Sequence, residues 1–596
     1  MEFLAHGEPA GGAPLQDVVI GSAVALISVI VLAVLTAIFR RGGLRWLRSI
    51  GAYAERLTGL PDWAIVPAAV TGFSAIVAAF GFYWDVSTHI DNGRDAGPFA
   101  NPSHFFILFG LAGIALAGYL SGVFATEKKL DKGVHLAGWA FPIGGFLLLV
   151  CGVIALMGFP LDDAWHRLFG QDVTLWGPTH IQMVGGASLS TLAMWIVLRE
   201  AEPYRTRDVD PWWLRHREIA AAGAFLIGLS TLQAEFDFAV PQFRLVFHPI
   251  LIMAAASIGL VAARVRLGRG GALQAVAFYI VVRAILSLLV GPILGRTTLH
   301  FPLYLAEALM VEIAGMLVPT DRRLRFALVA GAGIGTVGLA AEWGWSQIWM
   351  TNPWPAPLFA EAAITGPLTA LGGAVVGAMI GTALNREGRF RVPRPAAIIA
   401  GVAVVGCLVY AAPMDKGEPV TANVALERGS PDAERASVTV SLEPRDAAED
   451  ALWFHALAWQ GLDWNRGSSV HSQFEEIEPG VYRSEEPVPT TGEWKALIRL
   501  HVDDRVMATP IYLPEDEAIP APEVPAENRF SREFVPDKEI VQREAVGGNL
   551  TLERIAYGIL LLIGIVWIAA MAWGLVRLWS ERRTAATRGR GRLATT

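Results

Sequence analysis

The sequence has few cysteines and few charged residues, and each shortage excludes a class of protein. Only 2 of its 596 residues are cysteine. Because Cys151 and Cys407 lie in separate apolar runs, neither a disulfide framework nor a cysteine-based metal site is expected. Charged residues make up 17% of the chain, against about 25% in soluble domains. The positively charged flank of a cleavable signal peptide is also missing, because acidic residues precede the first apolar run. That run is therefore expected to stay in the protein.

The sequence is instead rich in long apolar runs. Hydrophobic residues make up 53% of the chain, and apolar runs of about 20 residues recur, each long enough to cross a bilayer as a helix. The pattern predicts an all-α polytopic membrane bundle of about 13 transmembrane helices. These are expected at 16–39, 62–84, 103–125, 136–158, 178–198, 218–240, 247–264, 272–294, 301–318, 325–350, 357–384, 395–412 and 552–577.

The loops alternate in positive charge, which predicts an orientation. Clusters such as Arg40, Arg41, Arg45 and Arg48 follow the odd-numbered predicted helices up to the eleventh, whereas the intervening loops hold at most one arginine each. Cytoplasmic loops are the ones enriched in Lys and Arg. The N-terminus is therefore expected outside the cell and the C-terminus in the cytoplasm.

One polar segment interrupts the apolar pattern near the C-terminus. It is acidic and rich in proline, and its alternating runs at 436–442 and 494–502 are typical of strands. We expect a small extracytoplasmic β-sandwich there, followed by an extended Pro/Glu-rich tether. The predicted domains are a membrane domain at 1–412, the β-sandwich at 413–515, the tether at 516–551, an anchor helix at 552–577 and a basic cytoplasmic tail at 578–596.

Two loops on the predicted outer side repeat one motif. Each begins with Asp-x3-His at the end of an apolar run and ends with Pro, a hydroxyl residue and His at the start of the next. The four-residue spacing places Asp and His on one helix face, and a helical hairpin returns to the membrane level that it left. Two imidazoles and a carboxylate then converge, a set compatible with copper, iron or zinc. The predicted metal ligands are Asp85, His89, His104, Asp162, His166 and His180.

A single copy of this motif is equally well explained by helix capping and loop hydrogen bonds. The repetition favours metal binding, as does the cost of placing ionisable groups at membrane depth. Further polar residues on the same side are candidates for extra ligands or a proton path, or for interhelical hydrogen bonds with an ion pair such as Arg283–Glu312. These residues are Glu235, Asp237, His248, His300, Glu307 and Glu342. His455, His471 and His501 of the β-sandwich are expected to be surface residues.

The double motif resembles the C subunit of the copper membrane monooxygenases, the particulate methane and ammonia monooxygenases. That subunit carries two adjacent triads, Asp-x3-His…His and Asn-x3-His…His. By the resemblance, residues 85–104 match the first triad and residues 162–180 the second, with Asp162 in place of Asn. Copper is the metal that it implies. The C subunit has fewer membrane helices and no β-domain of this kind, so monooxygenase activity is an implication of the resemblance alone.

The β-sandwich resembles YtkA/FixH-like domains of bacterial membrane proteins through Phe474, Gly480–Tyr482 and Gly492–Trp494. Such domains often occur near copper handling and oxidase assembly. Together with the apolar runs, the resemblance leads us to expect a multi-pass protein of the bacterial cytoplasmic (inner) membrane.

Three functions stay open, so the sequence does not decide whether the chain is an enzyme. The first is an outer-face copper oxidoreductase that uses dioxygen and a small apolar substrate from the membrane lipid. The second is non-enzymatic copper handling, by transport, delivery or oxidase assembly. The third is zinc-dependent hydrolysis with Asp163 or Glu235 as the base; no HExxH motif supports it. A homo-oligomer or additional membrane subunits remain open, and nothing indicates a nucleic-acid partner.

Overall fold

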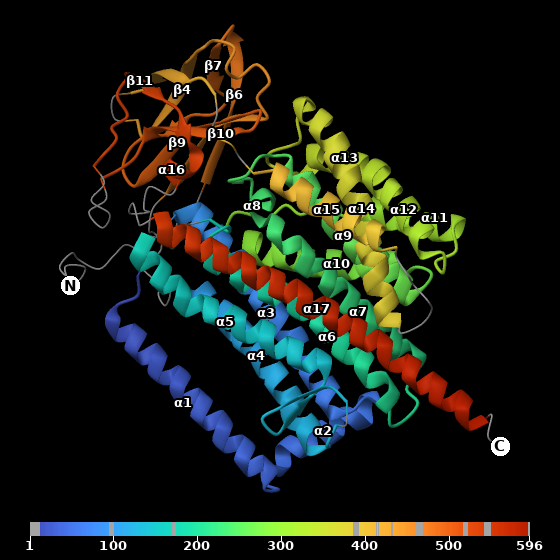
Figure 1. Ribbon diagram of the computed structural model, residues 1–596. Coiled ribbons are helices and arrows are strands. Elements are labelled where there is room, and N and C mark those ends of the chain that lie inside the picture. The colour runs from blue at the N-terminus through green and yellow to red at the C-terminus, as the bar shows by residue number, and fades with distance from the viewer. Residues whose placement is uncertain are drawn as a thin grey trace.

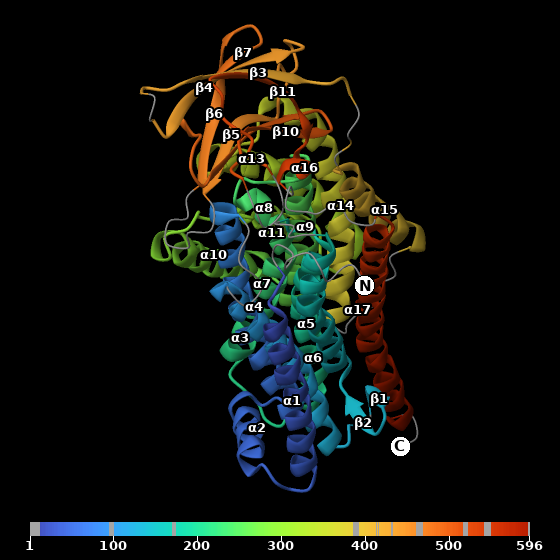
Figure 2. The same ribbon diagram turned by 90° about the vertical axis from the view of Figure 1, so that its left-hand side faces the viewer.

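The structure, a computed structural model, is a helical bundle that carries a β-domain at one end (Figure 1). It describes residues 12–93, 101–130, 132–169, 174–385, 393–412, 414, 417–430, 433–460, 469–515, 522–541 and 550–593. The short helix α2 (Arg45–Thr58) lies at the end of the bundle opposite the β-domain in both views (Figures 1 and 2). These two ends are called the β-domain end and the α2 end below.

Within the described residues, eleven helical segments are long and apolar enough to cross a membrane. They are α1 (Leu15–Arg40), α3 (Asp62–Asn92), α4 (Pro102–Glu127), α5 (Ile143–Phe169), α6 (Pro178–Ala201), α7 (Pro211–Ser230) continued by α8 (Ala234–Asp237), α9 (Phe247–Leu267), α10 (Gly271–Leu288), α12 (Arg323–Gly333) continued by α13 (Leu339–Trp349), α14 (Phe359–Asn385) and α17 (Leu550–Leu593). The two other predicted spans form shorter helices, α11 (Leu305–Leu317) and α15 (Arg394–Tyr410). The chain is therefore a multi-pass membrane protein.

The helix boundaries differ from the predicted ones at several places, and α17 continues to Leu593, into the segment predicted as a tail. Helices α3 and α5 continue to Asn92 and Phe169, beyond their apolar runs, and these added turns carry Asp85, His89, Asp162 and His166, which line a shared cavity described below. A short hairpin, β1 (Val134–Leu136) and β2 (Trp139–Phe141), replaces the predicted start of the fourth span. Helix α2 was not predicted, because its 14 residues alternate between charged and apolar side chains and form no apolar run.

Close helix packing holds α3, α4, α5 and α6 together as two adjoining hairpins. A Cβ on Gly118 of α4 would lie 2.2 Å from the amide nitrogen of Leu149 on α5. A Cβ on Gly152 of α5 would lie 2.4 Å from the amide nitrogen of Ala115 on α4. Small residues allow helix backbones to approach in this way in membrane proteins. The α4–α5 contact fixes the two motif-bearing hairpins side by side.

The β-domain is one antiparallel sheet that closes on itself. Its strands are β3 (Thr421–Glu427), β4 (Arg435–Glu443), β5 (Trp453–Gln460), β6 (Ser469–Glu478), β7 (Val481–Ser484), β8 (Val488–Pro489), β9 (Trp494–Val502), β10 (Arg505–Tyr512), β11 (Arg529–Glu533) and β12 (Val535–Pro536). They pair in the order β11-β3-β4-β7-β6-β5-β9-β10-β12, with β8 on β4. Since β11 and β12 are consecutive but pair with opposite edges, the domain is barrel-like. The predicted β-domain is confirmed, and its strands form one barrel-like sheet where a two-sheet sandwich was expected.

Part of the segment predicted as a tether belongs to this domain. Strands β11 and β12 and the short helix α16 (Asp537–Val541) lie within 516–551. Asp537 accepts hydrogen bonds from the buried Arg499 of β9, from Nη2 at 2.6 Å and from Nε at 3.1 Å. The proline content suggested an extended chain, but edge strands also accommodate proline.

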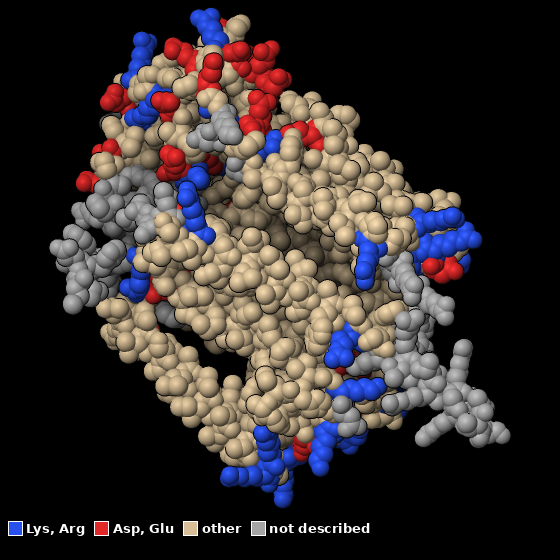
Figure 3. Space-filling view, in the orientation of Figure 1, with Lys and Arg blue, Asp and Glu red and all other residues tan. Residues whose placement is uncertain are grey.

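The β-domain is joined to the bundle by polar contacts between buried groups. Arg499 Nη2 donates to the Pro241 carbonyl at 2.6 Å, and the Leu245 amide donates to His501 Nε2 at 3.0 Å. The Pro241 carbonyl and the Leu245 amide both belong to the segment of the bundle between α8 and α9. Figure 3 shows that Asp and Glu side chains gather on the β-domain, where some Lys and Arg also lie, and that further Lys and Arg form clusters at the bottom and the right-hand edge of the bundle.

Candidate metal centre

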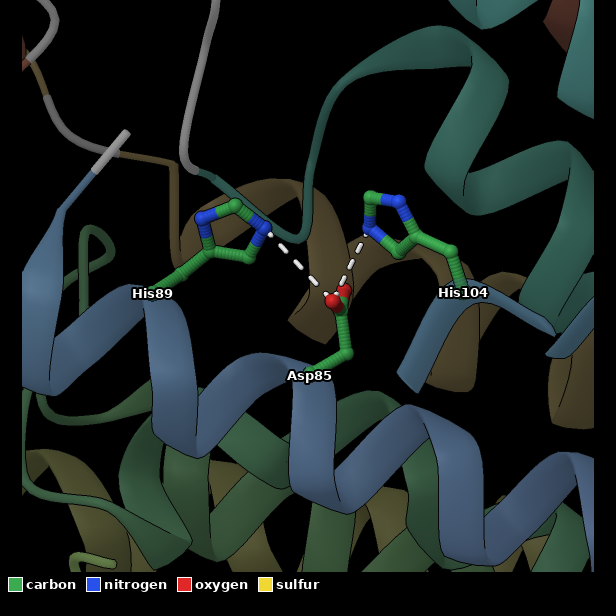
Figure 4. A group of neighbouring side chains, drawn as sticks. All are labelled: Asp85, His89 and His104. Carbon is green, nitrogen blue, oxygen red and sulfur yellow. Dashed lines mark ion pairs between the residues drawn. The ribbon is translucent and has the colours of Figure 1, made fainter. Parts of the chain in front are cut away.

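The first motif brings its three side chains together at the β-domain end. Asp85 and His89 occupy the last turns of α3, and His104 lies in the first turn of α4. Asp85 Oδ1 lies 2.9 Å from His104 Nε2 and 3.6 Å from His89 Nε2. Figure 4 shows both imidazole rings directed at the one carboxylate. We call these three residues the first triad.

The second motif forms the same arrangement on the next hairpin. Asp162 and His166 lie near the end of α5, and His180 lies in the first turn of α6. Asp162 lies 3.2 Å from His166 Nε2 through Oδ2 and 3.3 Å from His180 Nε2 through Oδ1. These three residues are the second triad. In each triad, three ligand atoms lie within 4.8 Å of one another, so each could hold one metal ion.

Backbone carbonyls orient one imidazole of each triad. His89 Nδ1 lies 2.8 Å from the Gly93 carbonyl oxygen, and His180 Nδ1 lies 2.6 Å from that of Thr174. Gly93 adopts φ 77°, a left-handed conformation that glycine tolerates best. The Nδ1–H donates in each pair, which leaves the Nε2 lone pair of the neutral ring directed at the carboxylate. Two lone pairs facing each other need a proton or a metal ion between them, and this outer-shell carbonyl is typical of metal-binding histidines.

Side chains just before the second histidine hold each carboxylate. Asp85 Oδ1 accepts hydrogen bonds from Asn101 Nδ2 and Ser103 Oγ, both at 2.7 Å. Asp162 Oδ1 accepts one from Thr179 Oγ1 at 2.5 Å. The hydroxyl residues that donate these hydrogen bonds, Ser103 and Thr179, are the ones that precede the second histidine in the repeated Pro-hydroxyl-His motif of the sequence. Metal-ligating carboxylates are commonly hydrogen-bonded in this way.

Both triads line one cavity of about 480 Å³. The ring of Phe159, one turn before Asp162, lies 6.1 Å from the ring of His104, so the triads are neighbours across the α4–α5 contact. Among the described residues they remain two groups of three and do not merge into one cluster. Leu457 and Trp459 of β5 also line the cavity, which places the β-domain over the triads.

The structure brings none of the six additional candidates into either triad, among the residues that it describes. Of these candidates, Glu235 lines the same cavity as the triads. It accepts hydrogen bonds from the Leu175 amide at 2.8 Å and from Trp176 Nε1 at 2.9 Å. It thereby fixes the loop whose Thr174 carbonyl orients His180. Glu235 is a positioning residue for the second triad.

The other five candidates lie elsewhere in the bundle. Asp237 pairs with Arg283, His248 Nδ1 accepts from Trp354 Nε1 at 3.1 Å, and His300 Nδ1 lies 3.1 Å from Thr351 Oγ1. Glu307 and Glu342 are buried, and one oxygen of Glu342 accepts from the Tyr304 amide at 2.7 Å. A proton path through these residues stays a prediction.

The expected Arg283–Glu312 ion pair was wrong. Arg283 pairs with Asp237 and lies over the ring of Tyr83. Glu312 instead pairs with Arg264 at 2.8 Å and accepts from the Gly270 and Ala272 amides at the start of α10. A carboxylate at a helix N-terminus is favoured by the helix dipole and the unpaired amides there, which the apolar sequence pattern does not reveal.

Two histidines of the β-domain, His455 and His501, are buried and His471 is half-buried, contrary to the prediction of surface positions. His455 and His501 have no exposed surface. Burial, with a smaller contribution from the positive charge of Arg499, holds the pKa of His455 well below its ordinary value and lowers that of His471 to about 4. Burial likewise lowers the pKa of His501 to about 3. The sequence shows strand alternation, but it does not show that one sheet face packs on the bundle.

No family model matches the chain, and no curated protein or solved structure shows significant similarity to it. The fold and the geometry therefore define the class of protein on their own. The chain is a multi-pass membrane protein with a barrel-like β-domain and two Asp/His/His groups of metal-binding type on one cavity.

Proposed function

We propose that the chain is a copper-dependent membrane oxidoreductase, with one copper ion held by each triad. The observation that carries the proposal is the repetition of one ligand set, with its supporting hydrogen bonds, on two walls of a single cavity. Imidazole and carboxylate suit copper, iron and zinc. The resemblance of the double motif to the copper membrane monooxygenases favours copper among them.

In this proposal, copper supplies one-electron redox chemistry and reactivity toward dioxygen. The residues of the chain would hold the ions, orient the ligands and shape the cavity. Asp85 and Asp162 bring negative charge to each ion, and the Gly93 and Thr174 carbonyls keep two imidazoles in the tautomer that exposes Nε2. Glu235 keeps the second triad in place, and the apolar walls of the cavity admit an apolar substrate and dioxygen while excluding bulk water.

The proposed site faces the outside of a bacterial cytoplasmic membrane. The argument is the positive-inside rule applied to the loops between the helices, together with the Lys and Arg clusters at the bottom and the right-hand edge of the bundle in Figure 3. The β-domain, the triads and the N-terminus would then lie at the outer side, and the C-terminus in the cytoplasm.

Hydrolysis by zinc finds less support, because both proposed bases are already engaged. Asp163 accepts from the Ala13 amide at 2.7 Å and from Arg167 Nε at 2.8 Å. Glu235 accepts from the loop that it positions. A general base needs a free acceptor within reach of the attacking water.

Copper handling without catalysis is the second candidate, favoured by one observation. Leu457 and Trp459 of the β-domain line the cavity that holds both triads, so a domain that receives or delivers copper would be correctly placed. The two proposals differ in what reduced copper does when oxygen is supplied.

The deciding experiment uses the full chain in detergent, loaded with copper, reduced and then exposed to oxygen. An oxidoreductase consumes oxygen faster when an apolar substrate is added, and the paramagnetic copper spectrum changes with that substrate. His89→Ala and His166→Ala should each abolish the effect, whereas His216→Ala, at an exposed site on α7 beside the ring of Trp212, should not. Copper binding without substrate-dependent uptake would favour copper handling, and no copper binding would refute both.

A further inference from the structure

The cavity lined by the triads is elongated along helices α3 and α6. Its lining residues on α3 extend from Ile65 to Ile90, which corresponds to roughly 38 Å along a helix. On α6 they extend from His180 to Leu198, or roughly 27 Å. The cavity therefore runs from the triads at the β-domain end through most of the bundle toward the α2 end. A volume of about 480 Å³ over this length leaves a narrow space.

The walls between the two ends are apolar. Among the described residues that line the cavity, charged or imidazole side chains occur only at its ends, namely Glu235 with the triads and Arg217 near the α2 end. The hydroxyls of Thr191 and Thr231 donate to backbone carbonyls of their own helices, at 2.6 and 2.9 Å. Thr71 and Ser188 also line this length, and among the described residues the buried Oγ1 of Thr71 has no hydrogen-bond partner. The rest of the lining there is apolar, so it offers a hydrocarbon a largely apolar surface and offers a metal ion no imidazole or carboxylate ligand.

The cavity opens sideways along α3. Ala69, Gly72 and Ile76 line it and lie on one stripe of the helix, and Ile76 is 51% exposed. Phe278 and Val282 of α10 line the facing wall. The opening lies within two helices that cross the membrane by length and hydropathy. It therefore faces the hydrocarbon of the bilayer.

We propose that this cavity binds one unbranched alkyl chain taken up from the lipid phase, with a polar end at the triads and the chain extending along α3 and α6. The narrow, apolar space selects a chain over a ring system, and the lateral opening gives access without passage through water. If the proposed function holds, long-chain molecules are the substrate class of the triads. The binding itself does not require that the triads hold copper.

The test uses two photoreactive probes in lipid nanodiscs, octanol and hexadecanol, each with a diazirine at the chain terminus. Because the hydroxyl end is held at the triads, the octanol label should fall on peptides near the triads. The hexadecanol label should fall farther along α3 and α6. Crosslinked peptides are identified by mass spectrometry.

Bulky substitutions at two depths should shorten the chain that fits. Ala79→Phe lies 10 residues from His89, and Ala75→Phe lies 14 residues from it, both on the cavity wall. Ala79→Phe should abolish the deep hexadecanol label, and Ala75→Phe should remove only its deepest sites. Ala277→Phe is the matched control, because Ala277 is exposed on α10 and does not line the cavity.

Labels spread over lipid-facing helices such as α1, with no difference among the three variants, would overturn the proposal. Equal thermal unfolding of the variants and the control excludes misfolding as the cause of a lost label. Copper content is measured on the same samples. Chain-length-dependent labelling without copper would refute the proposed function alone, and copper without such labelling would refute this inference alone.

Discussion

Replacement of Arg499 by Met should destabilise the attachment of the β-domain more than any surface charge change. Arg499 is fully buried and binds Asp537 through two hydrogen bonds and the Pro241 carbonyl through a third. Removal of the guanidinium leaves the carboxylate of Asp537, which is 2% exposed, without its partner. Breaking a buried ion pair from one side costs about 3–5 kcal/mol.

The assay is denaturant unfolding of the purified protein, combined with limited proteolysis of the β-domain. Arg483→Met is the matched control, because Arg483 is 47% exposed and lies 4.0 Å from Glu427. Exposed pairs contribute at most about 1 kcal/mol. Arg499→Met combined with Asp537→Leu should recover part of the loss, since no buried charge is left unpaired. Equal effects of the two single Arg variants would refute the reasoning.

Three further outcomes follow from the same contacts. The pKa of His471 is lowered to about 4 and that of His501 to about 3, both below the ordinary 6.5. As the pH falls, the unfolded chain binds protons at these histidines before the folded chain does, so the free energy of unfolding should be highest above about pH 6.5 and should fall toward pH 4. Unfolding midpoints that do not change between pH 7.5 and 5 would contradict this. Ser103→Ala removes a hydrogen bond to the carboxylate of the first triad and should weaken metal binding about 10- to 100-fold in a competition titration. Gly118→Val should cost at least about 1–3 kcal/mol because its side chain meets a backbone amide, whereas Gly401→Ala, with open space around it, should change thermal stability little.

The triads could be predicted from the sequence because their geometry is local. Asp85 and His89 are four residues apart on one helix, and His104 begins the next helix of the same hairpin. The membrane fixes the depth at which both helices end, so convergence required no knowledge of distant contacts. The same reasoning held for the second hairpin. The apolar runs likewise predicted the helices, since a bilayer demands that length and composition.

The remaining features depend on contacts between distant segments. Glu235 binds a loop about 60 positions earlier in the chain, and Arg283 pairs with a carboxylate on another helix. The buried Arg499 of the β-domain contacts both Asp537 of α16 and the Pro241 carbonyl of the bundle. Hydropathy and spacing describe one segment at a time. They indicate that a polar residue lies in the bundle, but they do not identify its partner.

The metal content of the purified protein tests the central claim most directly. After copper loading and removal of free ion, the account predicts two ions per chain, one for each triad. His89→Ala and His166→Ala should each lower the content to one ion, and the double variant should bind none, with all four proteins equally folded. A copper content that is the same in the double variant as in the unaltered protein would contradict the account.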